Sequence, residues 1–562
     1  MSATGVGPAS AALASDAFRT VALSGTPAPG MPEGVTFFRF ENPAINNAGQ
    51  VAFDGSLDGP DVTVFTPRIE GIWSEGAGAI GSPALIARTG SQAPGRPDGV
   101  NFTDFGYPVI NAAGQTAFRG FLSAGGLSLD GDGVWSEGAG SIGRAALVAG
   151  AGDQAPGAAP GVVFTAFDNP VLNAAGQTAF RGVVDGPGII PLFNNEGVWS
   201  EAAGAIGNPT LINPGGTPAP GAPEGVNFIF STPPSINAAG ETAFTAALGG
   251  DGVTRLNNIG VWSETTGSIG SPALAARKGD FAPGTTGFAR FDNFSSPALN
   301  DAGQITFFAL LDGPDIETTN DSGLWSEAAG SLGNPALIAR EGDPAPGTAD
   351  GVNYWRLSGF VLNAAGETAF KSQLIGPGVD TTNDSGVWSE AAGSIGSPAL
   401  VARAGTQAPG TPDGVNFLVF STPSLNAAGQ IAFEGILTGT EVDDDNDRGI
   451  WASEPNGELT LVVRNGDQFD VSDTAVPDLR TIASANLVAA SGNQGGQPSL
   501  FNDAGELVFR ARFTDGSEGI FVATIPEPAA ALAAAMLGLL AAGRRRTRRG
   551  VRTEATEKPI RF

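Results

Sequence analysis

Asn111-Ala112-Ala113-Gly114 and Gly133-Val134-Trp135 are the two stretches that decide the fold, because both recur along the whole chain. The tetrapeptide Asn-x-Ala-Gly begins at Asn46, Asn111, Asn173, Asn237, Asn300, Asn363, Asn426 and Asn502. The tripeptide Gly-aliphatic-aromatic ends at Trp73, Trp135, Trp199, Trp262, Trp325, Trp388, Trp451 and Phe521. Successive Asn-x-Ala-Gly motifs lie 62 to 65 residues apart, except the last two, which lie 76 apart. This periodicity indicates eight copies of one structural unit.

Each unit contains four stretches that are typical of β-strands. In the second unit an aromatic stretch (residues 100–105) precedes the Asn111 turn, and residues 116–122 follow it. Residues 133–137 form the third stretch, and a Gly-rich loop leads to the fourth, which residues 83–88 represent in the first unit. Alternate residues of these stretches are apolar, the period of a half-buried strand, and Asn-Gly and Pro-Gly pairs separate them as turns require. No unit contains an amphipathic helix.

Eight units of about 63 residues, each with four short strands, match the blades of a β-propeller. The ends of the repeat region support a closed ring. It begins with a lone fourth strand at residues 20–23 and ends with a lone third strand at residues 519–523, so the two termini would complete one blade together. We therefore predict an all-β propeller over residues 20–524, preceded by a leader (1–19) and followed by a tail that includes a short helix. The alternative is an open array of β repeats.

Composition excludes several chemistries. The chain of 562 residues has no Cys and no His, so disulfides, zinc–thiolate sites, imidazole ligands and Ser-His-Asp catalysis are absent. An enzyme would depend on carboxylates, Lys, Tyr or an oxygen-bound cation. The net charge is −28, and the 528 residues before the basic tail carry −34 of it, so this body would repel a phosphate backbone. We predict that the protein does not bind nucleic acid.

Aromatic and acidic side chains are the candidate site residues. Seven of the eight Trp share one repeat position, which indicates a structural core, whereas Trp355 and its neighbour Tyr354 occur in one unit only. We predict that Tyr354 and Trp355 bind a ligand such as a sugar ring. A Glu follows six of the repeated Trp by two residues (Glu75, Glu137, Glu201, Glu264, Glu327 and Glu390). We interpret these as solvent-facing side chains; the alternative is a circle of carboxylates that gathers cations.

The run Asp443-Asp444-Asp445-Asn446-Asp447 is the most acidic of the loops that precede the Trp strands. Oxygen ligands at alternate positions, here Asp443, Asp445 and Asp447, suit Ca²⁺. Turn chemistry is the competing explanation, because Asp and Asn also stabilise turns without a metal. Calcium is the one cofactor that the sequence suggests. The acidic run does not have the ligand spacing of an EF-hand.

The C-terminal segment has a different composition from the repeats. Pro526-Glu527-Pro528 precedes a run of 15 uncharged residues (529–543) and the basic cluster that contains Arg544, Arg545 and Arg546. A helix of 15 residues covers about 22 Å, less than the roughly 30 Å of a bilayer core, and the Arg cluster would stay on the cytoplasmic side. This order resembles the PEP-CTERM sorting signal of Gram-negative bacteria, and the repeats look like the tandem Asn-x-x-Gly-x-x-Ala-Phe repeats of some such proteins. Residues 550–562 extend past the usual end of that signal.

The resemblance implies export, a transient inner-membrane anchor formed by the C-terminal helix, and cleavage near residues 526–528 by an exosortase-type enzyme. It also implies a place at the cell surface or in a biofilm, with exopolysaccharide as a partner. Because carboxylates lie mainly at repeated positions, we predict a non-enzymatic surface or matrix protein. The alternatives are a glycan-binding propeller and, third, a carboxylate-dependent glycosidase or lyase.

Overall fold

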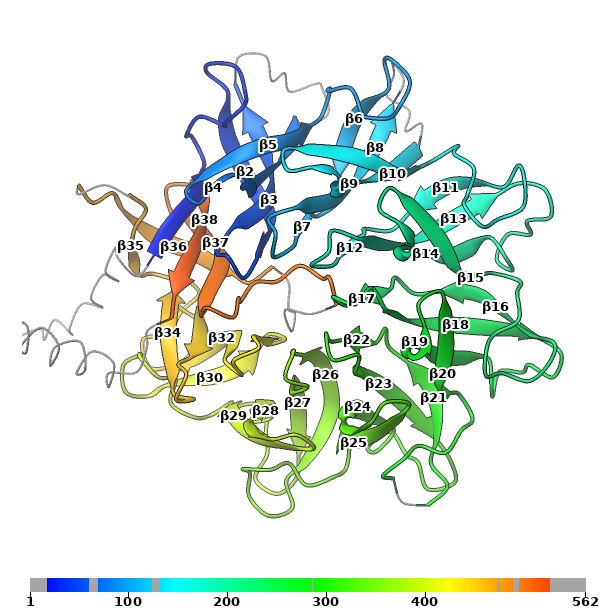
Figure 1. The fold of residues 1–562 in the computed structure, drawn as a ribbon. Helices are drawn as coiled ribbons and strands as arrows, with labels where there is room; N and C mark the ends of the chain where they lie inside the picture. Colours follow the sequence, from blue (N-terminus) through cyan, green and yellow to red (C-terminus); the bar gives the residue numbers. More distant parts are fainter. Residues whose placement is uncertain are drawn as a thin grey trace, which may run out of the picture.

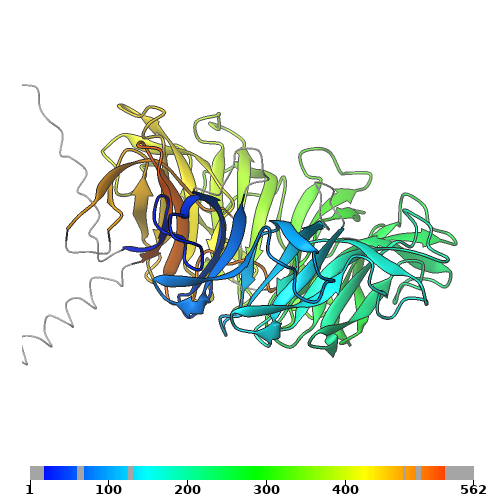
Figure 2. The same cartoon turned by 90° about the horizontal axis from the view of Figure 1, so that it is seen from above.

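Eight antiparallel sheets surround a central axis in the computed structural model (Figure 1). The structure describes residues 18–59, 69–123, 131–285, 287–472, 476–488 and 495–525. Within these residues every regular element is a strand. The predicted eight-bladed, all-β propeller is therefore confirmed, and Figure 2 shows the ring edge-on.

The blades are numbered by the order of their inner strands. Blade 1 contains β2 (Thr36–Ile45), β3 (Val51–Asp58), β4 (Glu70–Ala79) and β5 (Ser82–Arg88); blade 2 contains β6 (Asn101–Phe105), β7 (Val109–Ile110), β8 (Thr116–Ser123), β9 (Gly131–Ser141) and β10 (Arg144–Gly150). Blade 3 contains β11 (Val163–Phe167), β12 (Val171–Leu172), β13 (Thr178–Asp185), β14 (Glu196–Ala205) and β15 (Asn208–Pro214); blade 4 contains β16 (Val226–Ser231), β17 (Ser235–Ile236), β18 (Thr242–Gly250), β19 (Ile259–Ser268) and β20 (Ser271–Arg277).

The second half of the ring repeats this plan. Blade 5 contains β21 (Arg290–Phe294), β22 (Ala298–Leu299), β23 (Ile305–Asp312), β24 (Ser322–Ser331) and β25 (Asn334–Arg340); blade 6 contains β26 (Asn353–Leu362), β27 (Thr368–Ile375), β28 (Ser385–Ser394) and β29 (Ser397–Arg403). Blade 7 contains β30 (Val415–Phe420), β31 (Ser424–Leu425), β32 (Ile431–Gly439), β33 (Arg448–Ser453) and β34 (Leu459–Arg464); blade 8 contains β35 (Gln468–Asp470), β36 (Leu479–Asn486), β37 (Glu506–Phe513), β38 (Glu518–Thr524) and β1 (Phe18–Leu23).

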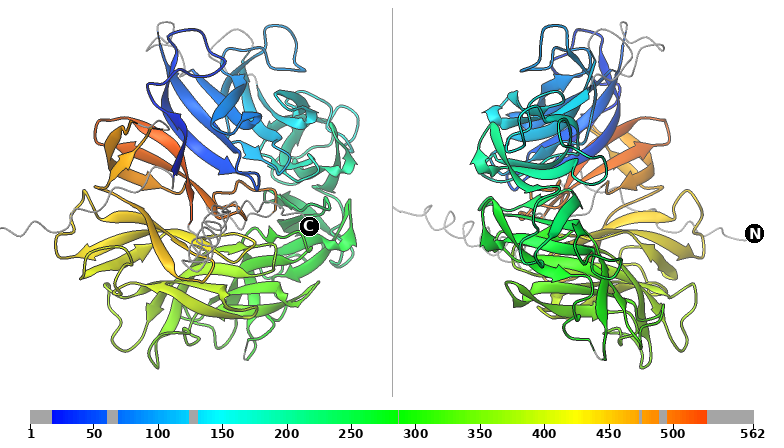
Figure 3. Two further views of the ribbon diagram at one scale, coloured as in Figure 1. Left: turned by 60° about the vertical axis from the view of Figure 1, so that its left-hand side comes forward. Right: turned by 90° about the vertical axis from the view of Figure 1, so that its right-hand side faces the viewer.

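Both chain ends close the last blade. β1 pairs antiparallel with β38, with Phe18 opposite Ala523 and Leu23 opposite Gly519, and the sheet order is β1-β38-β37-β36-β35. Figure 3 shows the blue N-terminal and orange C-terminal elements side by side. The predicted closure is confirmed and the open array is excluded, because the edge of β38 is paired.

The repeated Trp side chains form the core of the blades. All seven are at most 1% exposed, and each indole Nε1 donates to the carbonyl of a Pro in the preceding turn at 2.9–3.0 Å (Pro29, Pro94, Pro156, Pro220, Pro283, Pro346 and Pro409). Six of them stack on a Phe of the neighbouring strand at 6.0–6.5 Å between ring centroids. Burial of so large a ring with its N–H satisfied stabilises each blade.

The repeated Glu side chains are buried, so the prediction that they face solvent is wrong. All six are at most 1% exposed. One carboxylate oxygen accepts from the first backbone N–H of the second strand, as Thr178 N donates to Glu201 Oε2 at 2.7 Å, and the other accepts from the glycine of the hairpin turn, Gly207 in that blade. Each Glu therefore joins two turns of one blade and is not free to gather cations.

The repeated Asn side chains join the blades to one another. The Nδ2 of each donates to the backbone carbonyl of the corresponding Asn in the next blade at 2.8–3.3 Å. The last of these eight bonds runs from Asn502 to Asn46, so the circle is closed. We call this circle the asparagine ring.

The PEP-CTERM-like segment lies outside the described residues, as do most of the leader and the expected C-terminal helix. Residues 526–528, Arg544, Arg545 and Arg546 therefore stay a sequence-based prediction. Within the described part of the chain, no helix is long and apolar enough to cross a membrane.

Candidate functional site

The eight repeats can be compared with one another. Residues that recur in every unit maintain the fold, whereas residues found in one unit only are candidates for a function. The repeated Trp, Glu and Asn side chains are buried, and their polar atoms form hydrogen bonds within the blades or, for Asn, to the next blade. A site for a ligand or a reaction is therefore expected where one unit differs from the others. The junction of blades 5 and 6 is such a place.

The structure separates the two aromatic residues predicted to bind a ligand. Tyr354 is 2% exposed, takes the place of the Phe found in other blades, and packs edge-to-face on Trp388 at 5.0 Å between centroids. Trp355 lies half-buried on the other side of β26, and the Arg356 guanidinium lies 4.4 Å from its ring centroid. Only Trp355 of this pair can contact a ligand.

Tyr354 and Trp355 are consecutive strand residues, so their side chains point to opposite faces of β26, and the strand becomes irregular directly after them. The pairing of β26 with β27 shifts register between Trp355 and Leu357, and Arg356 adopts a left-handed conformation with a φ of 57°. A non-glycine residue in this region is strained unless its surroundings hold it there. Here the backbone N–H of Arg356 donates to Glu341 Oε1 at 2.5 Å.

Glu341 and Asp321 form a carboxyl pair that the repeated motifs did not reveal. Glu341 follows β25 and its backbone N–H donates to Ser322 O at 2.9 Å, which brings it to the start of β24, directly after Asp321. Glu341 is 4% exposed, and its Oε2 has no hydrogen-bond partner in the structure. Burial and the adjacent Asp321 carboxyl raise the pKa of Glu341 to about 7.

A comparison of the units could have found this pair. The residue at the position of Glu341 is neutral or cationic in the seven other units: Ser24, Thr89, Ala151, Gly215, Lys278, Ala404 and Asn465. Asp384 of blade 6 lies in the same sequence as Asp321, Thr-Thr-Asn-Asp-Ser-Gly, but blade 6 has Ala404 in place of the glutamate. Blade 6 thus repeats the aspartate of the site but lacks the glutamate.

Two carboxyl groups that interact at neutral pH can hold one proton between them. One then serves as a proton donor and the other as an acceptor, the arrangement that acid–base catalysis requires. Glu341 has the raised pKa, so it is the member of this pair that keeps its proton closer to neutral pH.

The loop predicted to bind calcium is held by a side-chain amide. Asn446 Oδ1 accepts from the backbone N–H of Asp443 at 3.2 Å, and its Nδ2 donates to Glu441 O at 3.1 Å. The corresponding Asn257, Asn320 and Asn383 make the same pair of bonds in other blades. In the described residues no three acidic, His or Cys side chains are placed to hold a metal, and Asp443, Asp445 and Asp447 are no exception. Calcium binding there stays a prediction, and turn chemistry explains the loop.

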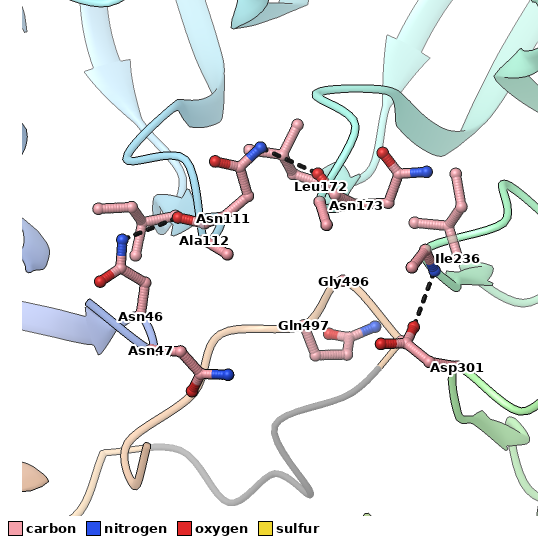
Figure 4. A pocket seen from close by; sticks show the side chains of 14 residues that line it. Asn46, Asn47, Asn111, Ala112, Leu172, Asn173, Ile236, Asp301, Gly496 and Gln497 are labelled. Carbon is pink, nitrogen blue, oxygen red and sulfur yellow. Dashed lines mark hydrogen bonds between the residues drawn. The ribbon is translucent and has the colours of Figure 1, made fainter. Parts of the chain in front are cut away.

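The axial pocket is lined by asparagines whose amides already have partners. It has a volume of about 120 Å³ and lies beside Asn46, Asn111 and Asn173 (Figure 4). Gly495 and Gly496 cross this end of the axis, and their carbonyls accept from Ile236 N at 3.0 Å and Leu172 N at 3.1 Å. This segment falls within the longer last repeat, and it narrows the axis at the asparagine ring.

A family model matches the chain over residues 9–142, 128–268 and 229–532, and its description is a family of unknown function, DUF7453. The chain belongs to the DUF7453 family. No curated protein matches it.

Solved structures that resemble the chain include three glycosidases. An α-L-arabinanase from Penicillium chrysogenum is 11% identical, covering 64% of this chain and 93% of the other, with a TM-score of 0.27. An α-L-arabinofuranosidase from Fusarium graminearum is 11% identical, covering 66% and 97%, with a TM-score of 0.26. A Trypanosoma rangeli sialidase is 10% identical, covering 75% and 55%, with a TM-score of 0.26.

The finding that these similar proteins are glycosidases overturns the prediction of a non-enzymatic surface or matrix protein. That prediction rested on carboxylates at repeated positions. Its physical fault is that the Glu341–Asp321 pair lies at an unrepeated one. Identities and TM-scores this low identify no substrate and no catalytic residue, so any role of the site depends on its own geometry.

Proposed function

We propose that this propeller processes a carbohydrate at the junction of blades 5 and 6, with Glu341 as the proton donor. The observation that carries the proposal is the buried Glu341 carboxyl group, whose pKa is raised to about 7 beside Asp321. Cleavage of a glycosidic bond needs a carboxylic acid that is still protonated near neutral pH. Glu341 meets that requirement at a position where no other unit has an acid.

The surroundings favour a neutral sugar over a charged polymer. The body of the protein is strongly acidic, so a polyanion would be repelled. Trp355 directly precedes Arg356, whose backbone N–H donates to Glu341, and its half-buried indole has one face that the Arg356 guanidinium leaves for packing against a sugar ring. In this proposal Trp355 positions the sugar, and Glu341 protonates the leaving glycosidic oxygen while its bond to the anomeric carbon breaks. Water adds to that carbon and its proton passes to the Glu341 carboxylate, and the adjacent Asp321 carboxyl keeps the pKa of Glu341 raised.

The test incubates the full chain with a panel of neutral polysaccharides. The release of reducing ends measures hydrolysis. We expect Glu341→Gln and Asp321→Asn each to lower the rate by about a hundredfold or more. Asp384→Asn is the matched control, because it makes the same change in blade 6, and it should leave the rate unchanged. The rate of the parent should fall as the pH rises through about 7, where Glu341 loses its proton.

Two results would reject the proposal. One is that no polysaccharide of the panel is cleaved by the parent protein. The other is that Glu341→Gln and Asp321→Asn cleave as fast as the parent, which would leave the acid pair without a catalytic role.

A further inference from the structure

One face of the ring carries a row of exposed aliphatic side chains. The hairpin that joins the third and fourth strands ends in such a residue in each of blades 1 to 6: Ile80, Ile142, Ile206, Ile269, Leu332 and Ile395, which are 43–53% exposed. The hairpin of blade 7 is polar instead, with Glu454, Asn456 and Glu458. We call the six aliphatic residues the hairpin tips. One exposed aliphatic side chain of this kind is ordinary, but its recurrence at the same position of six successive blades distinguishes this face from the opposite one.

The hairpin tips lie on the same face as the asparagine ring. In a four-stranded antiparallel sheet the turn between the first and second strands and the turn between the third and fourth lie at the same end. The contacts agree: Glu75 accepts from Val51 N, just after the Asn46 turn, and from Gly81 N, beside the tip Ile80. A Cβ on Gly76 would also meet Gly114 O of the next Asn turn at 2.0 Å.

Both chain ends leave the ring at this face. Ile525 N donates to Gly505 O, in the Asn502 turn, at 2.9 Å. At the other end, Arg19 Nη2 donates to Gly49 O, in the Asn46 turn, at 2.9 Å. The sequence that continues from Ile525 has 15 uncharged residues (529–543) and then five Arg among six residues.

The side of each hairpin that leads to its tip is free of charge, although in blade 2 the exposed Arg144 follows the turn glycine. From the residue after the buried Glu to the turn glycine, all six segments are built from Gly, Ala, Ser, Thr, Ile and Leu, as in residues 76–81 and 138–143. Such segments can approach an apolar phase without the cost of burying a charge. The row lies along one face of the ring, which suits a flat partner.

We propose that the face with the asparagine ring and the hairpin tips docks onto a lipid bilayer. The described chain ends at Ile525 on this face, and the sequence continues within a few residues into the apolar run 529–543, so a membrane that receives this run would lie against the tips. The tips then place one branched aliphatic side chain per blade at the bilayer surface, and the opposite face, with the Glu341–Asp321 pair, points into solution. This inference is independent of the reaction proposed above.

The chain has no Cys, so a single label can report which face meets lipid. Full-length Ile142→Cys and Ile269→Cys variants carry an environment-sensitive dye on two tips. Leu256→Cys, 67% exposed in the loop between β18 and β19, carries it on the opposite face as the matched control. Vesicles of phosphatidylcholine with a minor share of phosphatidylglycerol are added, with and without a lipid-linked quencher.

We expect the emission of the dye at positions 142 and 269 to shift to shorter wavelength when vesicles are added. The lipid-linked quencher should reduce this emission severalfold more than that of the dye at position 256, because only the tips enter the interface. Each labelled protein should unfold at the same temperature as the parent, which shows that it is folded. If one of the two tip variants does not fold, Ile206→Cys takes its place. Three outcomes would overturn the proposal: no response at the tips, an equal response at position 256, or a tip response to protein concentration without vesicles, which would indicate a second copy of the chain.

Discussion

At the residue scale, this protein buries an unusual number of carboxyl groups. Burial raises the pKa of Glu137, Glu201, Glu264, Glu327 and Glu390, although backbone N–H groups that donate to them partly oppose this. A carboxyl group whose pKa is higher in the folded than in the unfolded chain favours folding when protonated. Its contribution is fully present below the unfolded value and is lost as the pH rises through the folded value.

Glu341 has a raised pKa that defines a pH window for this effect. Its pKa rises from the ordinary value of 4.5 to about 7 in the fold. Glu341→Gln removes the cost of the ionised form, so at pH 8 we expect the variant to be more stable than the parent by about 1–3 kcal/mol. At pH 4 the Glu341 side chain of the parent is protonated and therefore neutral, like the glutamine of the variant, so the difference in stability should vanish. Urea unfolding of the variant and of the parent at the two pH values measures it, and an equal difference at both pH values would contradict the prediction.

At the element scale, the turns of the blades do more than connect strands. Asn363 Nδ2 donates to Glu367 Oε2 at 2.8 Å and to Asn426 O of the next blade at 2.9 Å, and its Oδ1 accepts from Glu367 N at 2.9 Å. Asn363→Ala leaves these buried partners unpaired, so we expect a loss of about 2–4 kcal/mol of unfolding free energy. Asn383→Ala removes a similar set of bonds from a loop open to water and should cost about 1 kcal/mol. Equal losses in denaturant titrations would refute a special role for the asparagine ring.

The segment that crosses the axis makes a second prediction at this scale. Gly496 has a φ of 68°, and a Cβ there would lie 2.8 Å from Ile236 Cγ2 and 2.9 Å from Leu172 N. Gly516 also has a positive φ, of 87°, but nothing lies within 4 Å of its Cβ position. Val at either site strains the backbone, and at position 496 it also clashes. We expect Gly496→Val to lower the unfolding midpoint clearly more than Gly516→Val; the same midpoint in both would mean that the segment does not pack on blades 3 and 4.

At the scale of the whole molecule, the repeat made the fold predictable. Eight motifs at similar spacings implied eight similar sheets, and the permuted ends implied the closure that β1 and β38 provide. The burial of Glu75 was predictable too, since strand alternation puts it on the same face as Trp73, but its acidity argued against burial. The Glu341–Asp321 pair depends on a hairpin that brings together residues 20 apart in the sequence, and on a comparison between units at a position that no motif marks.

Closure of the ring by its own ends leads to the last prediction. β1 covers the outer edge of β38, and Phe18 packs on Phe469 at 4.8 Å and Phe509 at 6.1 Å between ring centroids. Arg19 adds an ion pair with the buried Glu75 of blade 1 at 2.5 Å. Deletion of residues 1–25 therefore uncovers the edge of β38, removes part of the core of blade 8 and leaves the Glu75 carboxylate without its cation. We expect this variant to unfold with lower cooperativity and to aggregate through the free edge.

The control deletes residues 1–17 and keeps β1, so it should unfold like the parent. Calorimetry and light scattering on the three proteins distinguish the outcomes. If the variant that lacks residues 1–25 unfolds with the parent's midpoint and enthalpy and stays monodisperse, the ring does not need the pairing of β1 with β38. Blades 1 to 7 would then hold the ring together through the asparagine ring and the contacts between their own cores.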